Sequence, residues 1–287
     1  EIIDEVEADV IRPPAMGGTP LPGPNGGDGV AGGRWIWGAG TIGSLAQTVD
    51  AIHAAAEAGF EGQVLDIEHE VVNHGAGGGL FTEDTPYPED AEGDENWTGD
   101  DFVQFIRGTI RIPVTGDYTF GVHSDDGFGL RIWGAEFTSE SGAGNIDGLA
   151  ANSLIHPANT GDSNSRGTVA NMQAGDYDVE FFWWERGGGD FGELYYAAGA
   201  WENDEDTDQW ELLGQGDVQW VGAPLPVPEI VSVSAAANVA IGFTTPDPEA
   251  NHVLQNSADL VQWTDVADAA LSNDGDLYTF ASDKPAD

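Results

Sequence analysis

The chain has 287 residues, and its 51 acidic side chains against eight lysines and arginines give a net charge of −43 at pH 7. This charge excludes ordinary nucleic-acid binding and docking on anionic lipid, because both partners require a basic protein surface. The chain contains no cysteine, which excludes disulfides and thiolate metal sites, and it has no apolar run long enough to span a membrane.

The 41 glycines, 15 prolines and frequent aromatic residues are typical of a turn-rich β protein. We expect it to be secreted, extracellular or on a cell surface, where salt or divalent cations screen the repulsion among its acids. Its first residues do not form a charged-then-apolar leader, so we expect any export signal to have been removed or never to have been present.

Residues 1–30 are predicted to form an N-terminal arm and a Pro/Gly-rich linker. Val6, Ala8 and Val10 alternate with acids as in a strand, although the apolar residues of this stretch also fit one helix face. The region after Pro13 is too rich in proline and glycine for regular structure.

A short strand around Trp35 leads into a G-x-G-x-x-G sequence at Gly38–Gly43. Ser44 and Gln47 form a capping box for a helix that we expect to stop at Gly59. The apolar stripe of this helix is predicted to comprise Leu45, Val49, Ile52 and Ala56. This order of strand, glycine-rich sequence and helix resembles a dinucleotide-binding unit. However, no further alternation of strands and helices follows, so a parallel sheet cannot be completed. The dinucleotide-binding interpretation is therefore disfavoured.

His69 and His74 are reminiscent of a zincin helix, which needs its two histidines four residues apart to share one face. Here they are five apart. We interpret them as polar residues at a strand end.

From Phe102 the pattern becomes all-β, with large apolar residues alternating with small or polar ones. Residues 138–166 are interpreted as a long insertion of small and polar residues. The predicted strands are Phe102–Ile106, Thr109–Ile112, Tyr118–Val122, Leu130–Trp133, Thr168–Ala170, Tyr177–Trp184 and Glu193–Ala197.

Two adjacent carboxylates, Asp125 and Asp126, occupy the connection between two of these strands. Like charges so close repel, and a hard cation such as calcium, which takes six to eight oxygen ligands, would compensate them. A solvated Asp-Asp-Gly turn explains the local sequence equally well.

The proline-rich residues 224–228 are predicted to be a stiff linker. Beyond it, residues 229–287 are predicted to form a small β-sandwich with Trp263 as its core anchor. Its expected strands are Glu229–Ala235, Val239–Thr244, His252–Gln255 and Leu277–Ala281.

Several of these stretches together resemble the PA14 domain, a β-sandwich module of toxins, bacterial glycosidases and adhesins, and yeast flocculins. They are Gly116–Phe120, Ser124–Gly127, Leu130–Gly134, Gly175–Tyr177 and Trp183–Glu185. The resemblance covers residues 31–223 and implies a mainly β fold with one short helix. Residues 229–287 resemble, more weakly, small Ig- or fibronectin-like domains of secreted bacterial proteins.

In lectin-like PA14 domains, two adjacent aspartates joined by a cis peptide bond hold calcium together with a second loop. The resemblance therefore implies Ca²⁺ ligation by Asp125, Asp126, the side chain of Glu185 and the carbonyls of Gly187 and Gly189. The residues expected to contact a bound glycan are His123, Phe128, Trp184, Arg186, Asp190 and Phe191.

The function predicted from these observations is calcium-dependent carbohydrate binding or adhesion outside the cell. The alternative is a structural subunit of an extracellular filament or surface layer, in which the arm Glu5–Ile11 pairs with a neighbouring copy. No enzyme is predicted, because G-x-S-x-G, a cysteine nucleophile and a histidine-rich metal site are all missing from the sequence. A catalytic pair of carboxylates, as in glycosidases, is an alternative that the sequence leaves open, because any two of its 51 acids could lie together.

Overall fold

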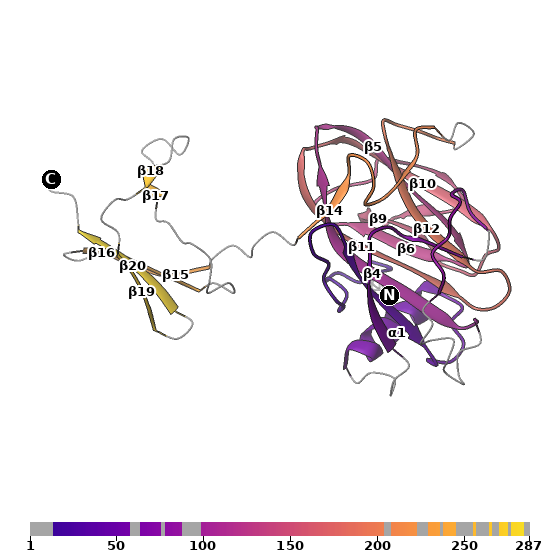
Figure 1. Cartoon of the computed structure of the whole chain (residues 1–287), viewed down its shortest axis with the longest axis horizontal. Coiled ribbons are helices and arrows are strands. Elements are labelled where there is room, and N and C mark those ends of the chain that lie inside the picture. The colour runs from indigo at the N-terminus through magenta and orange to yellow at the C-terminus, as the bar shows by residue number, and fades with distance from the viewer. Residues whose placement is uncertain are drawn as a thin grey trace, which may run out of the picture. The chain divides into compact units, whose positions relative to one another are not determined.

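The computed structural model describes residues 14–57, 64–75, 78–87, 99–203 and 208–222, together with strand segments between 229 and 283. The chain divides into two compact units, Glu1–Ala223 and Pro224–Asp287 (Figure 1). The arm up to residue 13, the linker 224–228 and Trp263 lie outside the described residues, and the predictions made for them stay predictions.

The first unit contains two antiparallel sheets, as the predicted mainly β fold requires. The larger sheet has the order β2-β1-β4-β11-β6-β9-β8, with β14 also paired to β4. Its strands are β1 (Ala31–Trp37), β2 (Val64–His69), β4 (Phe102–Ile112), β6 (Phe128–Ile132), β8 (Asn145–Asp147), β9 (Ala150–His156), β11 (Gly175–Glu185) and β14 (Gln219–Val221).

The smaller sheet has the order β13-β12-β5-β10-β7, with β3 also paired to β12. Its strands are β3 (Asn73–Gly75), β5 (Gly116–Asp125), β7 (Ser139–Gly142), β10 (Ser163–Met172), β12 (Phe191–Ala198) and β13 (Glu211–Leu212). Alternate residues of both sheets, such as Phe120 of β5 and Phe181 of β11, are buried in one shared core. The two sheets therefore pack face to face.

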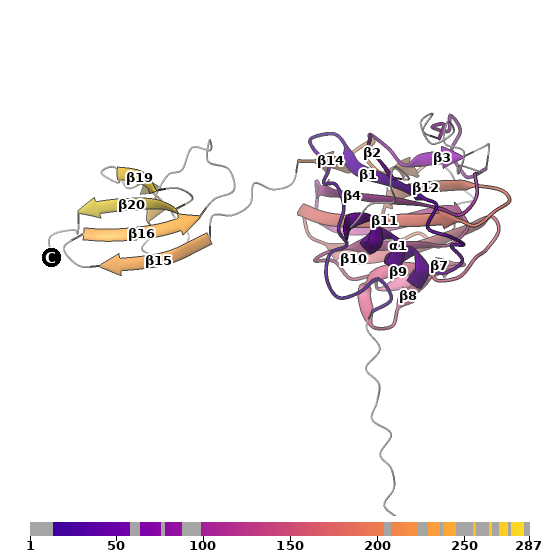
Figure 2. The same cartoon turned by 90° about the horizontal axis from the view of Figure 1, so that it is seen from below.

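One α-helix, α1 (Leu45–Glu57), is present within the described residues, on the outer face of the larger sheet (Figure 2). The predicted N-cap is confirmed, because the backbone N–H of Gln47 donates to Ser44 Oγ at 3.3 Å, while the Gln47 side chain accepts from Gly43 N at 2.9 Å. The predicted stripe is partly wrong, since Ala56 is exposed and Ala55 is buried in its place. The buried residues Thr48, Ala51, Ile52 and Ala55 follow the i, i+3, i+4, i+7 spacing counted from Thr48.

The strands around α1 rule out the parallel unit that a dinucleotide site needs. β1 is seven residues long and pairs with β2 in antiparallel register, with Trp35 opposite Leu65. The G-x-G-x-x-G sequence therefore belongs to a connection on the outside of an antiparallel sheet.

Two predicted boundaries in the sheets are wrong. The strands expected at 102–106 and 109–112 form the single strand β4, in which Gly108 lies against the ring of Trp220. A Cβ at Gly108 would approach that ring to 2.9 Å, so this glycine marks close packing and not a turn. The supposed insertion 138–166 contains β7, β8, β9 and the start of β10, of which β7 and β8 are largely exposed edge strands.

His69 ends β2 and His74 lies in β3, which agrees with the predicted strand end, and the two side chains form a buried polar pair. His74 Nε2 lies 3.2 Å from His69 Nδ1, and Gln104 Nε2 lies 2.8 Å from His69 Nε2. Trp35 and Trp183 pack against the His74 ring. Burial lowers the pKa of His69 to about 3 and that of His74 to about 4, so both rings are neutral in the folded chain at neutral pH.

This pair should make the fold sensitive to acid. The unfolded chain protonates both histidines near pH 6.5, whereas the folded chain does so only near pH 4 and below. Because the unfolded state then binds more protons, the contribution of the pair to the free energy of unfolding falls as pH drops from 6.5 towards 4. Urea unfolding between pH 7 and pH 4.5 should show that the free energy of unfolding falls less steeply in His69→Gln than in the parent. The control is His53→Gln, because His53 is an exposed histidine of α1. If the free energy of unfolding fell equally steeply with pH in all three proteins, the prediction would be wrong.

The second unit contains a four-stranded antiparallel sheet, β15-β16-β20-β19, and a two-stranded one, β17-β18. Three of the four predicted strands coincide with β15, β16 and β20, while the fourth overlaps β17 only at Gln255. The bounds are β15 (Glu229–Ala235), β16 (Asn238–Thr244), β17 (Gln255–Asn256), β18 (Thr264–Asp265), β19 (Ala270–Asp274) and β20 (Leu277–Asp283). An Ig- or fibronectin-like identity for this unit stays a prediction.

Across the part of the chain that the structure describes, α1 included, no helix has the length and apolar character needed to cross a membrane.

Candidate functional site

Asp125 ends β5, and Asp126 and Gly127 connect it to β6. The Asp125–Asp126 peptide bond is cis, as the PA14 resemblance implies. Asp126 N donates to the carbonyl of Trp184 at 3.0 Å, and Trp184 N donates to the carbonyl of Gly127 at 3.2 Å. The connection is therefore tied by its backbone to β11 of the opposite sheet.

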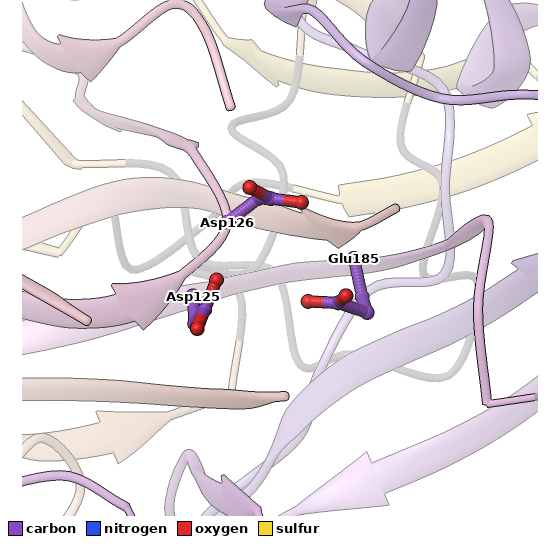
Figure 3. A group of neighbouring side chains, drawn as sticks. All are labelled: Asp125, Asp126 and Glu185. Carbon is purple, nitrogen blue, oxygen red and sulfur yellow. The ribbon is translucent and has the colours of Figure 1, made fainter. Parts of the chain in front are cut away.

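Glu185 ends β11, and this position brings its carboxylate to the two aspartates. Ligand oxygens of Asp125, Asp126 and Glu185 all lie within 4.8 Å of one another. Figure 3 shows the three carboxylates grouped around one common space, with two of them carried by one connection and the third by a separate strand. The structure thus brings together the three side chains predicted to hold the metal.

The Asp126 carboxylate is held from two sides. Its Oδ1 accepts a hydrogen bond from Thr160 N at 2.8 Å, and its Oδ2 accepts one from Arg186 N at 3.0 Å. Ser124 Oγ donates to the Asp126 carbonyl at 2.8 Å. These contacts fix the orientation of the carboxylate without placing a counter-charge directly on it.

Glu185 is fully buried, and one of its oxygens is unsatisfied. Its Oε1 accepts a hydrogen bond from Gly187 N, while Oε2 finds no hydrogen-bond partner among the described residues. Burial and the charge of Asp126 raise the pKa of Glu185 to about 8. Burial and the same neighbouring charge raise the pKa of Asp125 to about 6. The three carboxylates therefore repel one another in a space that favours a bound cation.

The glycines after Glu185 allow the second loop to stay close to this group. Gly187 and Gly188 have φ angles of 154° and 125°, which side-chain-bearing residues rarely adopt. A Cβ on Gly189 would lie 3.4 Å from Asp125 Oδ2. The loop thus lies beside both parts of the site, and metal ligation by the carbonyls of Gly187 and Gly189 stays a prediction.

Two of the aromatic residues predicted to contact a glycan are unavailable. Phe128 is fully buried in the core between the sheets. Trp184 is fully buried on the other face of the larger sheet, beneath α1, and its Nε1 donates to Asn159 Oδ1 at 2.9 Å. Neither ring can pack against a sugar. The prediction assumed that one face of this strand is open, whereas the helix covers it.

The other predicted contact residues lie around the carboxylates. His123 Nε2 is 2.6 Å from Asp162 Oδ1, and the His123 ring meets the mostly buried ring of Phe191 edge-on at 5.0 Å. Arg186 is exposed directly after Glu185. Asp190 lies near Tyr87, and burial raises the pKa of its carboxyl group.

Sequence reasoning missed the β9–β10 connection and the segment 78–87. Thr160 and Asp162 come from the first of these, where small polar residues gave no signal. The second is fastened by Glu193 of β12, which is buried and accepts hydrogen bonds from Leu80 N at 2.7 Å and Phe81 N at 2.9 Å. Burial raises the pKa of Glu193 to about 7.

Comparison with known proteins finds several similar solved structures and one matching family model. The PA14 domain sugar-binding module of an RTX adhesin has 17% identity and a TM-score of 0.41, covering 68% of this chain and 98% of that chain. The PA14 domain of the MpAFP antifreeze protein has 12% identity and a TM-score of 0.42, with coverage of 73% and 99%. The Epithelial Adhesin 9 A domain from Candida glabrata, solved with Galb1-3GlcNAc, has 12% identity and a TM-score of 0.37, with coverage of 71% and 98%. The search of curated proteins finds no match. The family model of the PA14 domain matches residues 82–206 of this chain.

Proposed function

We propose that this chain is a calcium-dependent carbohydrate-binding protein that acts in adhesion outside the cell. The observation that carries the proposal is the buried, unsatisfied Oε2 of Glu185 beside the carboxylates of Asp125 and Asp126. An uncompensated buried carboxylate is costly unless an ion or a proton neutralises it.

The three carboxylates suit calcium by their chemistry and spacing. Calcium binds oxygen ligands at about 2.3–2.6 Å, so two ligands of one ion lie at most about 5 Å apart. The oxygens of Asp125, Asp126 and Glu185 meet this limit. The absence of cysteine from the sequence disfavours softer metals that prefer thiolates.

Glycan binding would use the coordination positions of calcium that the three carboxylates do not fill. Calcium takes six to eight oxygens, and these side chains with the carbonyls of the Gly187–Gly189 loop leave positions for ligand oxygens. Two neighbouring sugar hydroxyls have the spacing and the neutral oxygen chemistry to fill them. The exposed Arg186 follows Glu185 directly and can donate hydrogen bonds to the same sugar. This role agrees with the resemblance to lectin-like PA14 domains.

A glycan array probed with the labelled full chain tests the function. We expect signals in millimolar calcium that vanish when a chelator is added, and that are lost in Asp125→Asn because a metal-binding charge is removed. Asp50→Asn, an exposed residue of α1, removes the same charge elsewhere and should bind like the parent. Signals that survive both the chelator and Asp125→Asn would place sugar binding away from this site.

A further inference from the structure

Two further acids extend the site, and strand pairing places them there. Ser124 of β5 is opposite Ser163 of β10. Asp162 comes directly before Ser163, and its Oδ1 lies 2.6 Å from Nε2 of His123, which shares a face of β5 with Asp125. The Asp162 side chain is 70% exposed, so a bound ligand can reach it.

The same reasoning applies on the other side of β5. Phe191 of β12 is opposite Asp125, and a Cβ on Gly189 would lie 3.4 Å from Asp125 Oδ2, so Asp190 between them lies beside Asp125. The Asp190 carboxylate lies near Tyr87. An acid thus stands on each side of the metal-binding connection. We call Asp162 and Asp190 the acidic rim.

The charges of the acidic rim are not needed to balance the charge of a calcium ion. Asp125, Asp126 and Glu185 already exceed the two positive charges of a calcium ion. Asp162 faces His123 and Asp190 faces a neutral phenol, so both rim acids add negative charge to the ligand-facing side. Arg186 supplies one positive charge against them. With calcium bound, this surface is still negative overall.

We propose that the acidic rim makes the site select sugars by charge, favouring sugars with a protonated amine and rejecting uronic and sialic acids. The inference rests on the proposed glycan function and specifies its substrate class. A ligand bound to calcium through two hydroxyls carries its remaining substituents to within a few ångströms of the site, well inside the screening length of about 8–10 Å. A carboxylate there is repelled by Asp162 and Asp190, and an ammonium group is attracted to them.

Matched monosaccharides test the selection. Methyl glucoside, methyl glucosaminide and methyl glucuronide share their ring and differ in charge, and the corresponding galactose derivatives cover the other common configuration. We titrate each into the calcium-loaded full chain at low salt and a pH at which the amine is protonated. We expect the aminosugar to bind several-fold more tightly than the neutral sugar, and the uronate about tenfold more weakly. Raising the salt to 1 M should shrink both ratios, because screening weakens surface charges.

The variant Asp162→Asn isolates the rim, and Asp162→Asn with Asp190→Asn strengthens the effect. Both should bring the affinity for the uronate closer to the affinity for the neutral sugar. Asp50→Asn on α1 should leave the ratio of these two affinities at the parent value. Calcium affinity is measured in parallel. If the uronate binds the parent as tightly as the neutral sugar, or if the variants leave the ratio unchanged, charge selection is wrong while the glycan function stands. If calcium binds and none of these sugars does, the glycan function fails and charge selection fails with it.

Discussion

Removing calcium is expected to lower the melting temperature of the first unit, and Asp125→Asn is expected to abolish this response. An ion that binds only the folded state stabilises it by RT ln(1 + [L]/Kd), about 2.7 kcal/mol at a hundredfold excess over Kd. For a unit of this size that corresponds to a shift of about 5–10 °C. Differential scanning calorimetry with calcium and with chelator measures it.

Asp125→Asn is the more informative variant for this test, because the Asp126 side chain also accepts two backbone hydrogen bonds. Losing those bonds would destabilise the fold whether or not an ion binds. In chelator, Asp125→Asn should be at least as stable as the parent, since it removes one of three repelling charges. Asp50→Asn controls for the loss of one negative charge from the chain. An Asp125→Asn variant that still responds to calcium as the parent does would show that the ion binds elsewhere.

The sequence predicts the first unit well where local pattern and burial agree. Alternating apolar residues identify most strands of the core, because in a two-sheet packing one face of each strand is covered. The capping pair Ser44 and Gln47 correctly places the start of α1, since the signal is contained within four residues.

The errors arise where a second layer or a distant segment decides the outcome. Alternation correctly places Trp183 and Trp184 on opposite faces of β11, but the ring on the outer face is also fully buried because α1 covers that face. The histidine pair is polar by sequence and buried in the structure, where Gln104 supplies the contact that makes this tolerable. Neither outcome is encoded in a local window.

The candidate site is divided in the same way. The adjacency of Asp125 and Asp126 is visible in the sequence, and the family resemblance suggests Glu185 as their partner. Asp162 was not found, because it reaches the site only through the register between β5 and β10. Register depends on long-range pairing that a single sequence does not display.

The largest single loss of stability is expected from Arg131→Met, which breaks a buried ion pair. Arg131 and Glu180 face each other across β6 and β11, with NH2 2.5 Å from Oε2, and they are 1% and 0% exposed. Arg131 also donates to the carbonyls of Gly17 at 2.6 Å and Thr19 at 3.1 Å, which fastens the N-terminal segment to the outer face of the larger sheet.

Arg131→Met leaves the Glu180 carboxylate buried without its charged partner, which typically costs about 3–5 kcal/mol. Replacing both residues, with Arg131→Met and Glu180→Leu, should recover much of this loss, because no unpaired charge remains. Arg111 and Asp176 provide the matched control, since they make a similar two-bond pair on the surface and Arg111→Ala should change stability little. Denaturant unfolding of the four proteins measures the coupling. If Arg131→Met were no more destabilising than Arg111→Ala, the pair would not hold the segment through its charge, and the packing of Met16 and Leu21 on the sheet would have to account for its position.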